Sequence, residues 1–417
     1  MTMDPRHHRG LIIAATSRAI RQKGGIWSVP SQQHGHGSYH VNLRTQKCSC
    51  LDHVEGGHKC KHLWAAEIVY QRQFEFNEDG TVTETETVAV QTVKRTTYSQ
   101  NWPAYDAAQI NEKSTFQTLL RDLCKGIVEP KNNMGRPRIP LSDAIFAAVY
   151  KVYSTVSGRR YMSDLREAHE KGHVTRLPAK SSVFAVLESE STAEVLRALI
   201  EESAMPLKAM ESHFSCDSSG FSGSRFDRWY DHKFGEVQIK RTWVKAHIMC
   251  GAKTNVITAV EIHEKEANDG KQLPALVKST AERFSISELS ADKAYGNSRN
   301  FEVIEDVGAT ALIPFKKNTS AKCASDLYRK AYHYFQAKRE EFDRRYHKRS
   351  NIESTFSMLK AKFGDSVRSK TDVAMKNEVL AKILCHNLCC LISAIYELGI
   401  APTFWTETAT VQNVTSA

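Results

Sequence analysis

The spacing of hydrophobic positions changes about halfway along this chain, which predicts two kinds of structure. Between residues 107 and 205, apolar residues such as Phe116, Leu120 and Leu123 recur every three or four positions. That spacing places them on one face of a helix, so an all-helical region is predicted there. From Phe214 onward, short apolar runs alternate with helix-like stretches, which predicts a mixed α/β sheet.

The α/β half contains four predicted strands and two predicted helices between them. The strands are Arg241–Cys250, Val256–Ile262, Ser287–Ala291 and Ala309–Ile313. The helices are Leu273–Phe284 and Ser298–Asp306. In the helical half, Ser142 is predicted to be the N-cap of a helix. A strongly apolar helix over Val379–Ile395 carries Cys385 and Cys389, which are interpreted as buried core residues.

The first 70 residues have the pattern of a separate small module. Two short alternating stretches around Trp27 and Val41 predict a strand pair, and Leu63–Val69 predicts a helix behind it. The expected plan is a small ββα module over 1–75, a linker over 76–106, a helical region over 107–205, an α/β domain over 206–400 and a flexible tail over 401–417. The fold class is therefore multidomain.

Charge adds a hint about partners. The net charge is +10, and half of it arises between Lys338 and Lys370, where ten Lys and Arg face five Asp and Glu. A basic stretch favours polyanions such as DNA, although a solvated helix face has the same composition. Because no run of 18 apolar residues occurs and the N-terminus lacks a signal-peptide core, we expect a cytoplasmic, nucleoid-associated protein without a membrane partner.

Four metal-ligating residues cluster in the N-terminal module. Cys48 and Cys50 are followed after a nine-residue loop by Cys60 and His62. Three sulfurs and one imidazole match the tetrahedral preference of Zn²⁺, and a full protein ligand set leaves no open position for chemistry. A structural zinc is therefore predicted, with His58 in the loop a poorer ligand. The pattern resembles the SWIM zinc finger, with Trp27 upstream.

Three acidic residues stand where they could serve phosphodiester chemistry, which needs carboxylates converging on divalent metal ions. Asp217 follows a short apolar segment, and Asp292 ends a predicted strand just before a Gly-containing turn. For either aspartate taken alone, a turn-forming or capping role is the favoured interpretation. Glu353 lies in the basic stretch on a predicted helix, near Tyr346, Arg349 and Lys360 at separations of three, four and seven residues. If Ser350 caps this helix, Tyr346 and Arg349 lie on its approach.

The order of these motifs resembles one large group of insertion-sequence DDE transposases. The residues Tyr346, Arg349, Glu353 and Lys360 match the spacing of its Y-R-E-K signature, and the segments around Asp217 and Asp292 resemble its first two catalytic blocks. The resemblance covers roughly residues 107–398, and it implies that the helical region over 107–205 serves DNA binding or dimerisation. It implies an RNase H-like sheet on which Asp217, Asp292 and Glu353 hold two Mg²⁺ ions. It also implies that Tyr346, Arg349 and Lys360 contact DNA phosphates, with Trp243, Lys245 and His247 as weaker candidates.

By this resemblance the protein cleaves double-stranded DNA at transposon terminal repeats and joins the freed 3′ hydroxyl to target DNA, as a homodimer in the DNA complex. Only sixty residues separate Asp292 from Glu353, which leaves no room for the β-rich insertion of some relatives, so the use of a hairpin intermediate stays open. The alternative is a catalytically inactive, transposase-derived DNA-binding protein that uses the SWIM module for recognition. A third reading is another RNase H-like nuclease, or a regulator that uses the module for protein contacts.

Overall fold

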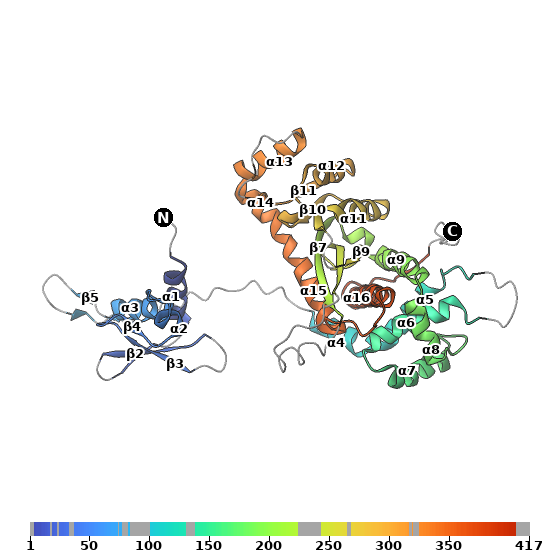
Figure 1. The fold of residues 1–417 in the computed structure, drawn as a ribbon, viewed down its shortest axis with the longest axis horizontal. Helices are drawn as coiled ribbons and strands as arrows, with labels where there is room; N and C mark the ends of the chain where they lie inside the picture. The colour runs from blue at the N-terminus through green and yellow to red at the C-terminus, as the bar shows by residue number, and fades with distance from the viewer. Residues whose placement is uncertain are drawn as a thin grey trace. The chain divides into compact units, whose positions relative to one another are not determined.

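A computed structural model shows two compact units, residues 1–99 and 100–417, each of which is described by itself (Figure 1). The structure describes residues 4–16, 19–22, 25–32, 37–73, 75–76, 82–83, 101–130, 138–223, 243–264, 268–316, 319 and 325–405. Most of the predicted linker, residues 131–137 and residues 406–417 therefore lie outside the described residues.

The N-terminal unit is a small antiparallel sheet backed by helices. Its strands lie in the order β1-β2-β3-β4, with bounds Ile20–Arg21, Ile26–Pro30, Ser38–Asn42 and Lys47–Cys48. Helices α1 (Pro5–Thr16), α2 (Leu51–Val54) and α3 (Lys61–Gln73) complete the fold, and α1 packs along α3. A separate pair, β5 (Glu75–Phe76) and β6 (Val82–Thr83), follows. The predicted strand pair and helix are confirmed, whereas α1 was not predicted because its polar start masks a short apolar stretch.

The second unit begins with the predicted helical region. Its helices are α4 (Trp102–Ile110), α5 (Glu112–Cys124), α6 (Leu141–Ser154), α7 (Gly158–Glu170), α8 (Lys180–Glu188), α9 (Ser191–Ala204) and the 3₁₀ turn η1 (Met205–Met210). Ser142 is not the N-cap of α6, which corrects the sequence prediction, because the helix already starts at Leu141. The carboxylate of Glu129 accepts hydrogen bonds from the amides of Leu141 and Ser142 and so replaces a local cap.

A five-stranded mixed sheet forms the centre of this unit. Its order is β11-β10-β7-β8-β9. The bounds are β7 His213–Ser222, β8 Trp243–Gly251, β9 Ile257–Glu264, β10 Glu288–Ala291 and β11 Thr310–Leu312. Strand β8 pairs antiparallel with both β7 and β9, whereas β10 pairs parallel with β7 and β11 pairs parallel with β10. The predicted strands are confirmed within the described residues, and the sheet is consistent with an RNase H-like domain.

Helices cover this sheet and link its edges (Figure 1). They are α11 (Asp269–Arg283), η2 (Lys293–Tyr295), α12 (Ser298–Asp306), α13 (Asp326–Ala337), α14 (Arg339–Tyr346), η3 (His347–Arg349), α15 (Ser350–Phe363) and α16 (Asp372–Leu398). Helix α15 packs on β7, and α11 packs on β9 and β8. Three predicted parts are thus present: a small sheet with a Cys/His cluster, a helical region and a mixed α/β sheet.

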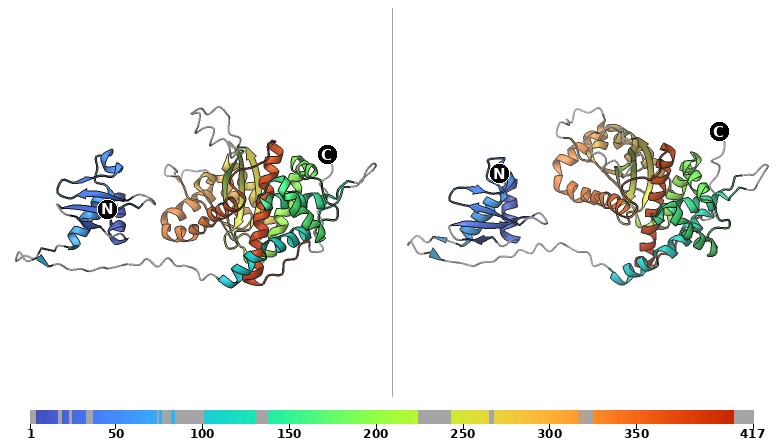
Figure 2. Two further views of the ribbon diagram at one scale, coloured as in Figure 1. Left: turned by 90° about the horizontal axis from the view of Figure 1, so that it is seen from below. Right: turned by 60° about the horizontal axis from the view of Figure 1, so that its bottom comes forward.

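Helix α16 is the centre of the second unit's core. It contacts α4, α5, α6, α8 and α9 as well as β8 and β9, and Figure 2 shows it between the sheet and the helical region. Its length and composition would suit a membrane span, but 72% of its apolar window is buried inside the structure. Cys385 is fully buried, as predicted. The buried amide of Asn387 bonds the Ile257 backbone N–H and C=O, which fixes α16 to β9.

The chain end returns to the helical region. Trp405 donates its backbone N–H to Glu202 and its indole N–H to the Leu123 carbonyl, both over 2.8 Å. Gly126 faces the indole so closely that a Cβ there would overlap it. Trp405 is therefore held against α5 and α9.

Candidate functional site

The N-terminal unit holds a buried group of metal-ligating side chains. Cys48 ends β4, Cys50 precedes α2, and Cys60 and His62 lie at the start of α3. All four are buried, and one ligand atom from each lies within 4.8 Å of the others. A tetrahedral zinc with bonds of about 2.1–2.3 Å requires ligand atoms roughly 3.5–4 Å apart, which this spacing approaches. The cluster fits a structural zinc site.

The cysteine thiols of the cluster shift one another's pKa values. The Cys48 thiol hydrogen bonds to Cys60 and lowers the pKa of Cys60, while the same contact and burial raise the pKa of Cys48. Nε2 of His62 is buried without a hydrogen-bond partner among the described residues. Bound zinc would release the remaining thiol protons and stabilise the thiolates. His58 is engaged elsewhere, since its Nε2 lies 3.0 Å from Asp52 and its Nδ1 lies 2.9 Å from the Gly56 carbonyl.

The central sheet brings the two predicted catalytic aspartates to neighbouring positions. Strands β7 and β10 run parallel with Cys216 opposite Ala291, so the next residues, Asp217 and Asp292, follow side by side. Strand β10 ends there, and Asp292 caps η2 through Lys293 N–H at 2.7 Å. Strand β7 continues to Ser222, so Asp217 lies within the strand and does not close it. This corrects the prediction, because pairing with β8 extends β7 past the carboxylate.

Arg349 joins Asp217 to Glu353. Its Nη1 donates to Asp217 Oδ2 over 2.9 Å, and its Nη2 donates to Glu353 Oε1 over 2.6 Å. Arg349 lies in η3, directly before α15, so the chain stays helical from α14 into α15 and Ser350 is not an N-cap. The guanidinium thus connects the sheet to the helix that carries the third predicted carboxylate.

Burial and neighbouring charges shift the pKa values of Asp217 and Tyr346. The pKa of Asp217 is raised, first by burial and also by the charge of Asp292, while Arg349 acts in the opposite direction. The pKa of Tyr346 is raised to about 12 by burial, and all three carboxylates act on it. The guanidinium of Arg349 lies 5.8 Å from the centre of the Tyr346 ring. Four predicted site residues therefore surround Arg349.

Lys360 lies farther along the same helix. Its ammonium donates to Ser219 Oγ over 2.7 Å and lies 5.3 Å from the Phe221 ring centre. Burial lowers its pKa. Two helical turns, about 10 Å, separate Lys360 from Glu353. Lys360 therefore extends the site along β7 and does not contact the carboxylates.

The carboxylates fit hard divalent cations by chemistry, since Asp and Glu oxygens are the ligands that Mg²⁺ prefers. Among the described residues, the ligand atoms of the Cys/His cluster lie within 4.8 Å of one another, but the carboxylate oxygens of Asp217, Asp292 and Glu353 are not gathered as closely. Arg349 accounts for this, because its guanidinium lies between two of them and balances their charge. In this structure the carboxylates of Asp217 and Glu353 are both paired with Arg349.

A second polar cluster lies beside Asp217 and joins the weaker candidates Lys245 and His247 to Asp269, which was not predicted. Asp269 at the start of α11 accepts a hydrogen bond from Ser218 over 3.1 Å and pairs with Lys245 at 2.5 Å. His247 is fully buried 3.6 Å from the same carboxylate, and burial lowers its pKa to about 4. Trp243 covers Gly220 on the neighbouring strand. No local signal marked Asp269, because its partners are distant in sequence.

Comparison with known proteins places this site in a family context. Residues 208–388 match the family model described as the transposase DDE domain, a range that contains Asp217, Asp292 and Glu353. No curated protein matches the chain. A transposase DDE domain implies transposition chemistry on DNA, and that family usually uses Mg²⁺.

Proposed function

We propose, on the premise of a transposase DDE domain at residues 208–388, that this protein is a DDE transposase of the Y-R-E-K group. It would cleave DNA at the ends of its element and transfer the freed 3′ hydroxyl into target DNA. The observation that supports this most strongly is the register of β7 and β10, which sets Asp217 beside Asp292, together with the Arg349 bridge from Asp217 to Glu353.

The carboxylates of Asp217, Asp292 and Glu353 are proposed to hold two Mg²⁺ ions, which when bound supply activation of the attacking oxygen and stabilisation of the leaving one. The reaction is two displacements at phosphorus. In the first, a water oxygen bonds to phosphorus and the P–O3′ bond breaks, which leaves a 3′ hydroxyl on the element. In the second, that hydroxyl attacks a target phosphodiester, and a target 3′ hydroxyl leaves.

Arg349, Tyr346 and Lys360 are proposed to bind phosphate oxygens near the cleaved end. Arg349 is already oriented by two carboxylates, and its planar fork can hold a phosphate through two parallel hydrogen bonds. Lys360, on the next two turns of α15, would contact a further phosphate. This division places one cation at the reacting phosphate and another along the strand.

The N-terminal cluster is proposed to be a SWIM-type zinc finger that contributes DNA or protein contacts, with zinc in a structural role. The protein is further proposed to act as a homodimer on two DNA ends and to work in the cytoplasm, at the nucleoid.

Cleavage of DNA tests the proposal. The full-length protein is incubated with Mg²⁺ and labelled duplexes taken from the sequences that flank its gene, and 3′ ends and joined products are resolved on a gel. Wild type should cut and join, whereas Glu353→Gln should bind the duplex and do neither. Glu302→Gln, an exposed glutamate on α12, is the matched control and should keep full activity. Strand transfer retained by Glu353→Gln would rule out the assigned triad.

The same experiment separates the alternative of an inactive DNA-binding protein. That protein would bind the flanking duplex in both variants and cut it in neither, whatever the divalent ion. Cleavage by wild type alone favours the transposase.

A further inference from the structure

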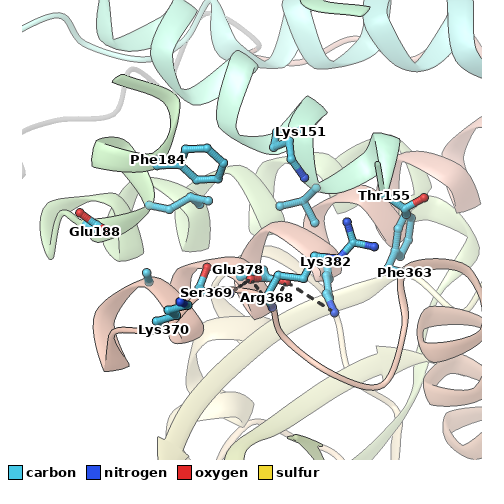
Figure 3. Close-up of a pocket in the computed structure, with 13 residues that line it drawn as sticks. Lys151, Thr155, Phe184, Glu188, Phe363, Arg368, Ser369, Lys370, Glu378 and Lys382 are labelled. Carbon is cyan, nitrogen blue, oxygen red and sulfur yellow. Dashed lines mark hydrogen bonds and ion pairs between the residues drawn. The ribbon is translucent and has the colours of Figure 1, made fainter. Parts of the chain in front are cut away.

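A cavity at the C-terminal end of α15 is lined by positive charge. It has a volume of about 270 Å³ and lies between α6, α8, α16 and the loop after α15 (Figure 3). Four cationic side chains line it against two carboxylates, which gives a net charge of +2. The charged lining residues are Lys151, Arg368, Lys370, Lys382, Glu188 and Glu378.

Lys151 is the unusual member of this group. Its side chain is only 8% exposed, yet no hydrogen bond or ion pair to another described residue holds its ammonium. Figure 3 shows it pointing from α6 into the cavity. Burial, and next the charge of Arg368, lower its pKa. Burial partly desolvates this ammonium, and an anion that enters the cavity would offset that cost.

The other charges leave room for such an anion. Lys382 is already satisfied by the carbonyls of Gly364 and Ser366, at 3.1 and 2.7 Å. Glu378 is occupied by the backbone amides of Arg368 and Ser369. The guanidinium of Arg368 uses Nη1 for the Val156 carbonyl, and no other bond of that group to the described residues is present. Lys151 and Arg368 therefore converge on the cavity with donors to spare.

We propose that this cavity, named here the Lys151 pocket, binds a phosphate group of DNA. Phosphate suits several cations that approach from different directions, and an arginine fork binds two of its oxygens at once. The apolar wall of Val152, Phe184 and Phe363 offers a surface for the attached sugar or base. The source in DNA rests on the proposed function, while the anion site itself does not.

The position of the pocket relative to the carboxylates agrees with one continuous DNA segment. Helix α15 carries Glu353 near its start and Phe363, which lines the pocket, at its end. Ten residues of helix span about 15 Å, or about four base-pair steps along a duplex. A strand bound at the carboxylates can therefore place another phosphate in the Lys151 pocket.

Binding of the full-length protein to duplex DNA without divalent metal tests the proposal, because no cleavage is needed. Affinity is measured over a series of salt concentrations for wild type, Lys151→Met and the matched control Lys208→Met, an exposed lysine on η1. The plot of log K against log salt has a negative slope. Loss of one phosphate contact should make that slope less steep by about one in Lys151→Met and leave it unchanged in Lys208→Met.

A second measurement distinguishes DNA from free phosphate. Inorganic phosphate should raise the unfolding temperature of wild type but not of Lys151→Met if the pocket binds the anion itself. Protection by phosphate with an unchanged DNA salt slope would retain the site and reject DNA as its source. An unchanged slope and no protection would overturn the proposal. Lys370 lies at the exposed rim of the Lys151 pocket, so Lys370→Met provides a second variant that should fold normally.

These outcomes are separate from those of the cleavage test. A protein that fails to cut DNA in Mg²⁺ but loses one phosphate contact in Lys151→Met would disprove the proposed transposase activity and keep the pocket.

Discussion

Removing the guanidinium of Arg349 is expected to make stability depend more strongly on pH. In Arg349→Met the side chain keeps its length but no cation remains between Asp217 and Glu353. The contact with Asp217 is 2.9 Å long, and the two side chains are 18% and 25% exposed, so solvent screens it only partly. Glu353 is 63% exposed and should contribute little.

The magnitude follows from the charge that is lost. An opposite charge at this distance lowers the pKa of an aspartate by about one to three pH units. Each unit corresponds to about 1.4 kcal/mol. The pKa of Asp217 is already raised by burial in the wild type, and the variant should raise it further. We therefore expect an additional loss of about 1–4 kcal/mol in Arg349→Met.

The sign of the pH dependence is fixed by that direction. A carboxyl whose folded pKa lies above its unfolded value of about 3.9 stabilises the fold at low pH, and the stability is lost as pH rises through the folded pKa. The extra loss in Arg349→Met should thus be absent near pH 4 and complete above the raised pKa of Asp217. Other effects of the substitution, such as lost packing, are independent of pH.

Differential scanning calorimetry over a pH series measures this, since it can resolve the unfolding of the 100–417 unit from that of the zinc module. The control is the Asp217→Asn background, in which the pH-dependent part should disappear. Parallel stability profiles of wild type and Arg349→Met, or a pH dependence that persists with Asn at position 217, would refute the reasoning.

Two further predictions concern the zinc module and the chain end. Purified protein should contain about one zinc per chain by metal analysis. Cys48→Ser should lose this zinc, whereas the control Cys124→Ala, which changes a buried cysteine of the other unit, should keep it. Wild-type protein without zinc would disprove the site. Gly126→Ala should destabilise the 100–417 unit by about 1–3 kcal/mol in thermal unfolding, because its Cβ overlaps the Trp405 indole. In a Trp405→Leu background that loss should shrink, and an undiminished loss would point to a cause other than the indole.

Much of the fold follows from local patterns. The alternation of strands and helices after Phe214 could be predicted because each element is short, apolar and bounded by polar turns. The candidate zinc ligands could be predicted because Cys48, Cys50, Cys60 and His62 lie within one short stretch. The spacing of Tyr346, Arg349, Glu353 and Lys360 survives in the structure as one nearly continuous helical path.

The parts that sequence reasoning missed depend on distant partners. The Glu129 cap of α6 and the Asp269 partners of Ser218 and Lys245 come from other elements, so no local pattern marks them. The extent of β7 past Asp217 is set by pairing with β8. The burial of Lys151 had a local signal, because it is a single lysine in the apolar stretch of α6. No local pattern indicated that it lines a cavity.

Anomalous diffraction from crystals of the full-length protein with Mn²⁺ and end DNA tests the central claim most directly. We expect manganese bound by Asp217 and Asp292, with Glu353 released from Arg349 to the same site and the guanidinium moved to a DNA phosphate. Manganese absent from these carboxylates, at metal concentrations that support cleavage, would contradict the account.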